Sequence, residues 1–443
     1  MKDYTKFVIA GIQLLFFSMT LHAQHKENVN ELSLEDMWKI AEVNNRHLKL
    51  SDLKLQQSAL EVLEAKDRLL PELSVGGDLK LNSSFLIYDQ GLFSSPQDVP
   101  VKGYGYGVGY QLNFNLFNGG KDRRNIIIKK EETAQKQYEL ELQKQSVKYD
   151  LAAAYFDLYK FLHFSDFLDA EIKTEKKQLS LIENLHKNGV VLKSDVLRTS
   201  VKLSQLELSF SEVSKKIEIM RQHLNILMGR EKEAELTINY KEIPEPGAAT
   251  SSDQEDIDTA FNNSAEYKLV NSDIKLSELN IRQAKATVLP KISLYSNYNY
   301  TYPQISFYPY SNDLWGFGQT GIRIQFSIDD LYKRKNLMAH AQMVSLEVKE
   351  KAEITKDEFS LRIKEAYLEE QQALESVETA VKNITKTTEA VRVIRSSYLN
   401  QESLLTDLLE AENALLEAKF NLTTAQANVK LTHIKLLAIA GTL

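Results

Sequence analysis

The placement of proline is the feature of this 443-residue sequence that most constrains its fold. The chain has 8 prolines, and none of them lies in residues 121–243 or 310–443. A proline inside a helix costs about 3 kcal/mol or more, so stretches of this length without one permit very long helices. Sandwiches and α/β enzymes need more frequent turns, and the sequence disfavours them.

The N-terminus has the pattern of a secretory signal peptide, which we predict over residues 1–23. Lys2 and Lys6 precede an apolar run from Phe7 to Thr20, which is too short to span a membrane as a helix. A plausible cleavage site ends at Ala23, although a buried N-terminal helix is the alternative. No other segment is apolar enough for a transmembrane helix, so any membrane span must consist of strands.

The composition argues against several classes of function. The formal net charge of −7 argues against a nucleic-acid partner held through its phosphates. The absence of cysteine removes disulfides, thiolate chemistry and a lipidated N-terminal cysteine. The histidines form no His-Glu-x-x-His motif, and no Gly-x-Ser-x-Gly elbow occurs. We therefore predict no enzyme activity and no catalytic, cofactor or metal site.

The chain consists of two related halves. Residues 64–75 resemble 282–294 at an offset of 219, and residues 109–124 resemble 321–336 at an offset of 212. The second offset continues to the C-terminus, so one loop between 82 and 108 is seven residues longer in the first half. A duplication with a single loop difference indicates that both halves share one fold.

Each half is predicted to contain a helix, two strands, a long helix, a turn and a returning helix. The first repeat spans 24–229, a linker with Pro, Gly, Ser and acidic residues spans 230–256, and the second repeat spans 257–443. The predicted helices are 33–69, 120–187, 194–228, 257–289, 331–398 and 406–440, and the predicted strands are 72–82, 103–117, 291–302 and 316–328.

The predicted strands alternate between apolar residues and small or polar ones. Residues 104–116 place Tyr, Val, Leu and Phe on one face and Gly, Gln and Asn on the other. A soluble sheet would pack its apolar face on a core, whereas a membrane β-barrel would expose that face to lipid. The signal peptide and the many tyrosines, which are typical of membrane interfaces, favour the barrel.

Four strands cannot close a barrel, because the smallest transmembrane barrels have about eight. Open strand edges in lipid leave backbone groups unpaired, so several copies must share one barrel. The helix predicted over 331–398 would be about 100 Å long and would continue from the barrel in a hollow helical cylinder. A fibrous coiled coil is the alternative, but it does not explain the strands.

Several motifs, in this order and spacing, resemble the TolC family of outer-membrane efflux proteins across essentially all of the mature chain. They are Leu70-Pro71 and Leu289-Pro290 before the strands, NLFNGGKDRR at 115–124, the segment 188–207, and the endings ILMG at 226–229 and AIAG at 438–441.

The resemblance implies a mainly α fold with a membrane β-barrel. A homotrimer would form a 12-stranded barrel in outer-membrane lipid and a long periplasmic α-helical barrel. The implied function is a passive exit duct of a tripartite efflux or type I secretion system. Its partners would be a periplasmic adaptor and an inner-membrane pump. The alternative is a periplasmic coiled-coil adaptor or scaffold without a membrane barrel.

The resemblance also assigns roles at the two turns between the paired long helices. Asn188, Gly189 and Val190 match the turn that contacts the adaptor in the family. Asp195 and Tyr398 match positions in the network that closes the entrance of the tunnel.

Two acidic residues match the ring that narrows the tunnel entrance. Asp407 and Glu410 are three apart and share one helix face. Three copies would place six carboxylates around the pore, where they would attract cations. The alternative is that they are acids in a first helical turn, favoured by the helix dipole. Gln401 replaces the usual glycine of this turn, and Ser403 replaces a basic residue, so this tip is expected to differ.

Overall fold

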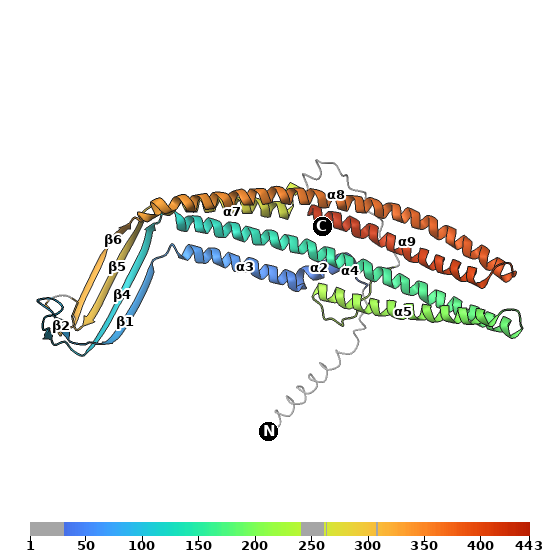
Figure 1. Cartoon of the computed structure of the whole chain (residues 1–443), viewed down its shortest axis with the longest axis horizontal. Coiled ribbons are helices and arrows are strands. Elements are labelled where there is room, and N and C mark those ends of the chain that lie inside the picture. Colours follow the sequence, from blue (N-terminus) through green and yellow to red (C-terminus); the bar gives the residue numbers. More distant parts are fainter. Residues whose placement is uncertain (1–30, 241–260, 263, 307–308) are drawn as a thin grey trace, which may run out of the picture.

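A computed structural model describes residues 31–240, 261–262, 264–306 and 309–443. The predicted signal peptide and most of the linker lie outside these residues. The molecule is elongated, with a sheet at one end and two helix-hairpin tips at the other (Figure 1). Among the described residues, no helix is both long enough and apolar enough to cross a membrane.

The sheet is antiparallel and has the strand order β1-β4-β5-β6. Its strands are β1 (Glu72–Leu81), β4 (Tyr104–Phe117), β5 (Lys291–Tyr302) and β6 (Trp315–Gln325). The pairing of β4 with β5 joins the two repeats. β1 pairs only with β4 and β6 only with β5 within this sheet, so each outer strand has one edge without a strand partner in the described chain.

One face of the sheet carries apolar side chains that the chain does not cover. Leu79, which pairs with Tyr106, is 90% exposed, and Tyr106 stacks on Tyr302 with ring centroids 5.0 Å apart. The other face is polar, and a Cβ at Gly109 would collide with the side chain of Asn299. An uncovered apolar face of this kind marks a surface that contacts lipid or protein.

Strand β6 is shorter than the 316–328 predicted from the alternating pattern, because it ends at Gln325. Gln325 pairs with Lys291, the first residue of β5, which follows Pro290. Proline has no N–H to continue the ladder, so the apolar residues after Gln325 have no strand to pair with. The loop after β1 holds a further hairpin that we did not predict, β2 (Phe85–Ile87) with β3 (Gln97–Val99).

Two long helices run the length of the helical body, α4 (Lys121–Lys187) and α8 (Asp329–Leu399). Each packs against two shorter helices placed one after the other (Figure 1). Along α4 these are α3 (Arg46–Asp67) and α5 (Lys193–Met228), and along α8 they are α7 (Ala265–Lys285) and α9 (Leu405–Ala440). The two halves join because α4 also packs against α7 and α9.

The largest core cluster lies in the middle of the body, where the end of α5 meets residues 34–48. Leu151 and Leu158 of α4, Leu224 of α5 and Met37 are fully buried there. The burial of large apolar side chains at this joint holds the shorter helices in place along α4.

The single helix predicted over 33–69 is wrong, because Asn45 divides it into α2 (Leu34–Asn44) and α3. The Asn45 Oδ1 accepts the backbone N–H groups of His47 and Leu48 at 2.8 and 3.1 Å. Its Nδ2 donates to the Leu227 carbonyl at 2.6 Å. Asn45 therefore caps α3 and also ties it to the end of α5.

The second repeat uses a related cap. Ser264 lies 219 residues after Asn45, and its Oγ accepts the Tyr267 N–H at 3.1 Å. The helix predicted over 257–289 therefore begins at Ala265, ends at Lys285 and is followed by a short 3-10 turn at Ala286–Val288. Residues 257–260 lie outside the described chain.

We predict that Asn45→Ala destabilises the helical body by about 1–2 kcal/mol, because both the cap and the bond to Leu227 are lost. Thermal unfolding followed by circular dichroism should show a lower Tm. Gln57→Ala, at an exposed position of α3, is the control. Equal Tm values for the two variants would contradict the role given to Asn45.

Candidate functional site at the helix-hairpin tips

The first tip is a glycine-containing helix end. α4 ends at Lys187, and Gly189 has a left-handed backbone with φ +76°. The Val190 N–H donates to the Leu185 carbonyl at 2.9 Å, and the Gly189 N–H donates to His186 at 2.9 Å. This pair of bonds is the Schellman arrangement, which satisfies the last carbonyls of a helix. Asn188, Gly189 and Val190 are all exposed at this end of the molecule.

The second tip has the same conformation, so the expected difference at this turn is not found in the backbone. Gln401 has φ +64°, although it carries a side chain. The Glu402 N–H donates to the Ser397 carbonyl at 2.8 Å, and the Gln401 N–H donates to Tyr398 at 3.0 Å. The two turns are 212 residues apart, which is the offset of the repeat.

Asp195 and Asp407 occupy equivalent positions at the starts of α5 and α9. The Asp195 carboxylate accepts the Leu192 N–H at 3.3 Å. The Asp407 carboxylate accepts the Leu404 N–H at 3.2 Å and the Ser403 hydroxyl at 3.0 Å. Each aspartate thus satisfies a backbone group at the positive end of a helix dipole. Asp407 has a structural contact in addition to any role in a ring, whereas Glu410 lies exposed along an adjacent groove.

A cleft of about 500 Å³ separates the two tips, and both Asp195 and Tyr398 line it. The Tyr398 hydroxyl is buried and has no hydrogen-bond partner among the described residues. Burial raises the pKa of Tyr398, and the negative charge of Asp195 raises it further. The structure therefore brings the two predicted residues of the closing network into one cleft.

Exposed apolar side chains gather at the cleft between the two tips. Leu192 is 71% exposed and Leu404 is 70% exposed, and Val190 and Leu399 are also exposed. The two tips lie at the far end of the body from the sheet (Figure 1). Exposed apolar residues gathered at one end of a molecule indicate a contact surface for another protein.

A cluster of charged residues close to the tips was not predicted. The Lys202 Nζ of α5 lies 2.6 Å from Glu412 of α9, 3.3 Å from Glu175 of α4 and 3.8 Å from Glu171. Arg395 of α8 binds the other oxygen of Glu412 at 2.9 Å. The members come from four helices, so no spacing in the sequence could have revealed the cluster.

Three carboxylates of this cluster are spaced closely enough to bind a cation. Oxygens of Glu171, Glu175 and Glu412 all lie within 4.8 Å of one another. The ammonium of Lys202 already lies within 4 Å of each carboxylate. Lys202 therefore supplies the positive charge that such a group would otherwise take from a metal ion.

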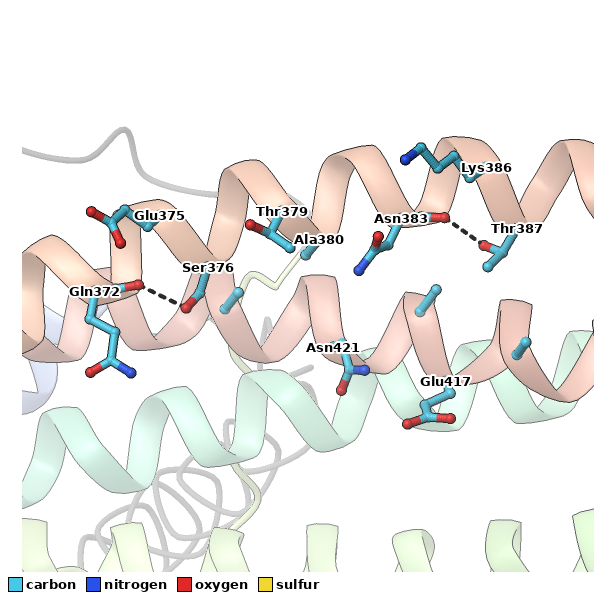
Figure 2. A pocket seen from close by; sticks show the side chains of 13 residues that line it. Gln372, Glu375, Ser376, Thr379, Ala380, Asn383, Lys386, Thr387, Glu417 and Asn421 are labelled. Atoms are coloured by element: carbon cyan, nitrogen blue, oxygen red, sulfur yellow. Dashed lines mark hydrogen bonds between the residues drawn. The ribbon is translucent and has the colours of Figure 1, made fainter.

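A polar groove of about 610 Å³ runs along α8 and α9 (Figure 2). Its lining is mainly small or uncharged, and includes Thr379, Ala380, Asn383, Thr387, Ala414, Ala418 and Asn421. The first-repeat equivalents of Ala380 and Ala418, at the offset of 212, are Leu168 and Leu206. Those two leucines are buried beneath Leu416 and Phe420 of α9. The groove is therefore the second-repeat equivalent of a surface that α9 covers in the first.

Comparison with known proteins places the chain in a family. The sequence model of the outer membrane efflux protein family matches residues 38–230 and 257–442, so the chain belongs to this family. No curated protein sequence matches the chain. The resemblance inferred from the sequence motifs is thereby confirmed.

Solved structures of outer-membrane channels have the same fold. The Campylobacter jejuni CmeC channel is 16% identical, with a TM-score of 0.78 over 93% of this chain and 86% of that one. VceC from Vibrio cholerae is 15% identical, with a TM-score of 0.72 over 92% and 96%. The open state of Neisseria gonorrhoeae MtrE is 18% identical, with a TM-score of 0.71 over 92% and 88%. The predicted fold class of a mainly helical, duplicated tunnel protein is confirmed.

We predict that Gln401→Gly stabilises the second tip by about 1 kcal/mol, because a left-handed backbone strains any residue with a Cβ. The Tm of the variant should rise in a thermal melt. Gln401→Ala keeps the Cβ and should give no gain. A rise with alanine as large as that with glycine would show that the side chain, and not the backbone strain, is responsible.

Proposed function

We propose that the chain is a trimeric outer-membrane channel-tunnel that acts as the passive exit duct of a tripartite efflux or type I secretion system. The observation that carries this proposal is the sheet, which has an uncovered apolar face and two outer edges without a strand partner among the described residues. In lipid the apolar face is solvated by acyl chains, while the edges must pair with other strands. The helical body of about 100 Å then extends away from the membrane.

Three copies would give each outer strand of the sheet a partner strand. Four strands from each of three chains make twelve, with β1 of one copy beside β6 of the next. Twelve strands lie within the range of closed outer-membrane barrels, which leave a polar interior. Membership of the outer membrane efflux family supports this arrangement.

The groove of Figure 2 supports the same assembly in the helical part. Phe420 of α9 packs on Phe164 of α4, in the first repeat, with ring centroids 4.4 Å apart. The repeat equivalent of Phe420 is Leu208 of α5, which is 62% exposed. Leu208 of a second copy would lie in the groove beside Ala380 and Ala418, so each copy would cover the groove of its neighbour.

The tips are the proposed periplasmic entrance. The turn at Asn188, Gly189 and Val190 would receive a periplasmic adaptor through its exposed apolar surface, and the adaptor would connect the duct to an inner-membrane pump. Asp195 and Tyr398 would hold the entrance closed. Asp407 and Glu410 of three copies would form an acidic ring around it.

The alternative, a periplasmic adaptor or coiled-coil scaffold, needs no uncovered apolar sheet. The family match also favours the duct. Expression with detergent extraction separates the two proposals. The duct should require detergent, have the mass of three chains and give single-channel conductance in planar bilayers. A protein that is monomeric without detergent would contradict it.

We predict that Leu208→Glu weakens the trimer, because it places a charge in the apolar contact between copies. Native mass spectrometry or light scattering in detergent should show dissociation. Ser209→Glu adds the same charge at the neighbouring exposed position and serves as the control. A stable Leu208→Glu trimer would exclude this contact between copies.

We predict that the double variant Asp407→Asn with Glu410→Gln conducts more or is blocked less by divalent cations, because the ring loses its charge. Asparagine retains a carbonyl oxygen that can cap α9. Glu353→Gln on α8, far from the tips, is the control. Unchanged conductance together with unchanged cation block would remove the acidic ring from the proposal.

A further inference from the structure

Glu175 is a fully buried carboxyl group that the proposed duct does not use. Its exposed fraction is 0%, and neither carboxyl oxygen has a hydrogen-bond partner among the described residues. Its nearest cation is the Lys202 ammonium, 3.3 Å from Oε2. A buried carboxylate without hydrogen bonds is costly as an anion and much less costly as a neutral acid.

The surroundings of Glu175 contain charged groups from all four helices of the tip region. They are Glu171 on α4, Lys202 on α5, Arg395 on α8, and Glu412 and Lys419 on α9. Burial is the largest effect on Glu175 and raises its pKa, while the charge of Lys202 opposes this and the charge of Glu412 adds to it. Burial raises the pKa of Glu171 as well.

Lys202 is placed between two competing partners. Glu175 belongs to the same hairpin as Lys202, formed by α4 and α5, whereas Glu412 belongs to the hairpin of α8 and α9. The bond from Lys202 to Glu412, at 2.6 Å, therefore joins the two hairpins. Glu175 makes no such connection between hairpins, because its ion pair to Lys202 stays within one of them.

Ionisation of Glu175 would change the balance of charge in this cluster. With Glu171, Glu175 and Glu412 all ionised, three carboxylates have oxygens within 4.8 Å of one another, and the Lys202 ammonium lies within 4 Å of each of them. The three negative charges would repel one another between the hairpins, in a region of low dielectric constant where repulsion is strong. A proton on Glu175 removes one of these charges and leaves the ammonium to Glu412.

We propose that Glu175 is a proton-binding site that couples pH to the spacing of the two hairpin tips. With a proton on Glu175, the Lys202–Glu412 bond holds the hairpins together. When the proton is lost, Glu175 competes for Lys202 and repels Glu412, so the hairpins separate. The consequence for passage through the entrance rests on the proposed function, but the movement itself does not.

The repeat shows that this site is specific to one interface. The second-repeat equivalents of Glu175 and Lys202, at the offset of 212, are Thr387 and Ala414, which line the groove of Figure 2. The first-repeat equivalent of Glu412 is Ser200. The fold itself therefore does not require charge at these three positions, because their repeat equivalents Thr387, Ala414 and Ser200 are uncharged.

The direction of the pH effect follows from the raised pKa of Glu175. The joined arrangement binds the proton more tightly than a separated, hydrated arrangement does. The Lys202–Glu412 bond between the hairpins is therefore at full strength below the ordinary glutamate pKa of 4.5. It weakens as the pH rises through the pKa of the buried Glu175.

The test measures the distance between the tips in the full chain in detergent. The chain has no cysteine, so Lys187→Cys and Asn400→Cys, both at exposed positions, introduce the only two sites for spin labels. Pulsed electron paramagnetic resonance should show a population with a short distance between the labels, and this population should be lost as the pH rises from about 4 to about 9. Glu175→Gln should retain that population at every pH, and Lys202→Met should lose it at every pH.

Glu183→Gln is the matched control, since Glu183 is an exposed carboxyl group on the same helix. It should respond to pH as the unmodified chain does. A pH-independent distance in the unmodified chain, or an unchanged response in Glu175→Gln, would overturn the proposal. Restoration of the short distance at high pH by Zn²⁺ alone would also overturn it in favour of a metal site. None of these measurements needs channel activity, so a failure of the duct proposal can be distinguished from a failure of the proton-binding proposal.

Discussion

A helix of about 100 Å needs an apolar partner along its whole length, and the rest of the structure depends on this constraint. Neither α4 nor α8 can bury one face by itself, so each is lined by two shorter helices placed end to end. The joint between those helices must then satisfy helix ends in the middle of a packed body. Asn45 does this in the first repeat by bonding to α3 and α5 at once.

The duplicated unit also leaves complementary surfaces uncovered. Within the described chain, β1 and β6 each lack one strand partner, and the groove on α8 and α9 lacks the helix that covers its first-repeat equivalent. Another copy of the chain carries a suitable partner in both places. Its β6 can pair with β1, and its α5 can cover the groove as α9 covers the first-repeat equivalent. A ring of copies is the arrangement that satisfies the strand edges and the helical groove together.

Elements with a long, regular periodic pattern could be predicted from the sequence, and elements set by distant contacts could not. The strand 291–302 and the long helices were predicted closely, because alternation and the absence of proline persist over many residues. The break at Asn45 was missed because the sequence around an asparagine in a helical pattern does not show a distant hydrogen-bond partner. Here that partner is the Leu227 carbonyl, which accepts from the Asn45 amide. The end of β6 was missed because it depends on where β5 begins. Gln401 was noticed in the sequence, but only the structure shows that it has the conformation of the equivalent glycine.

The sequence by itself determined the duplication, the order of helices and strands, and the family, since all of these follow from local patterns repeated along the chain. It also singled out Asp407 as a member of an acidic ring, with an acid in a first helical turn as the alternative. Only the tertiary structure decided that Asp195 and Tyr398 share a cleft and that Lys202 stands between Glu175 and Glu412. Contacts between residues more than two hundred positions apart are fixed by how the hairpins pack, and burial sets their electrostatic strength.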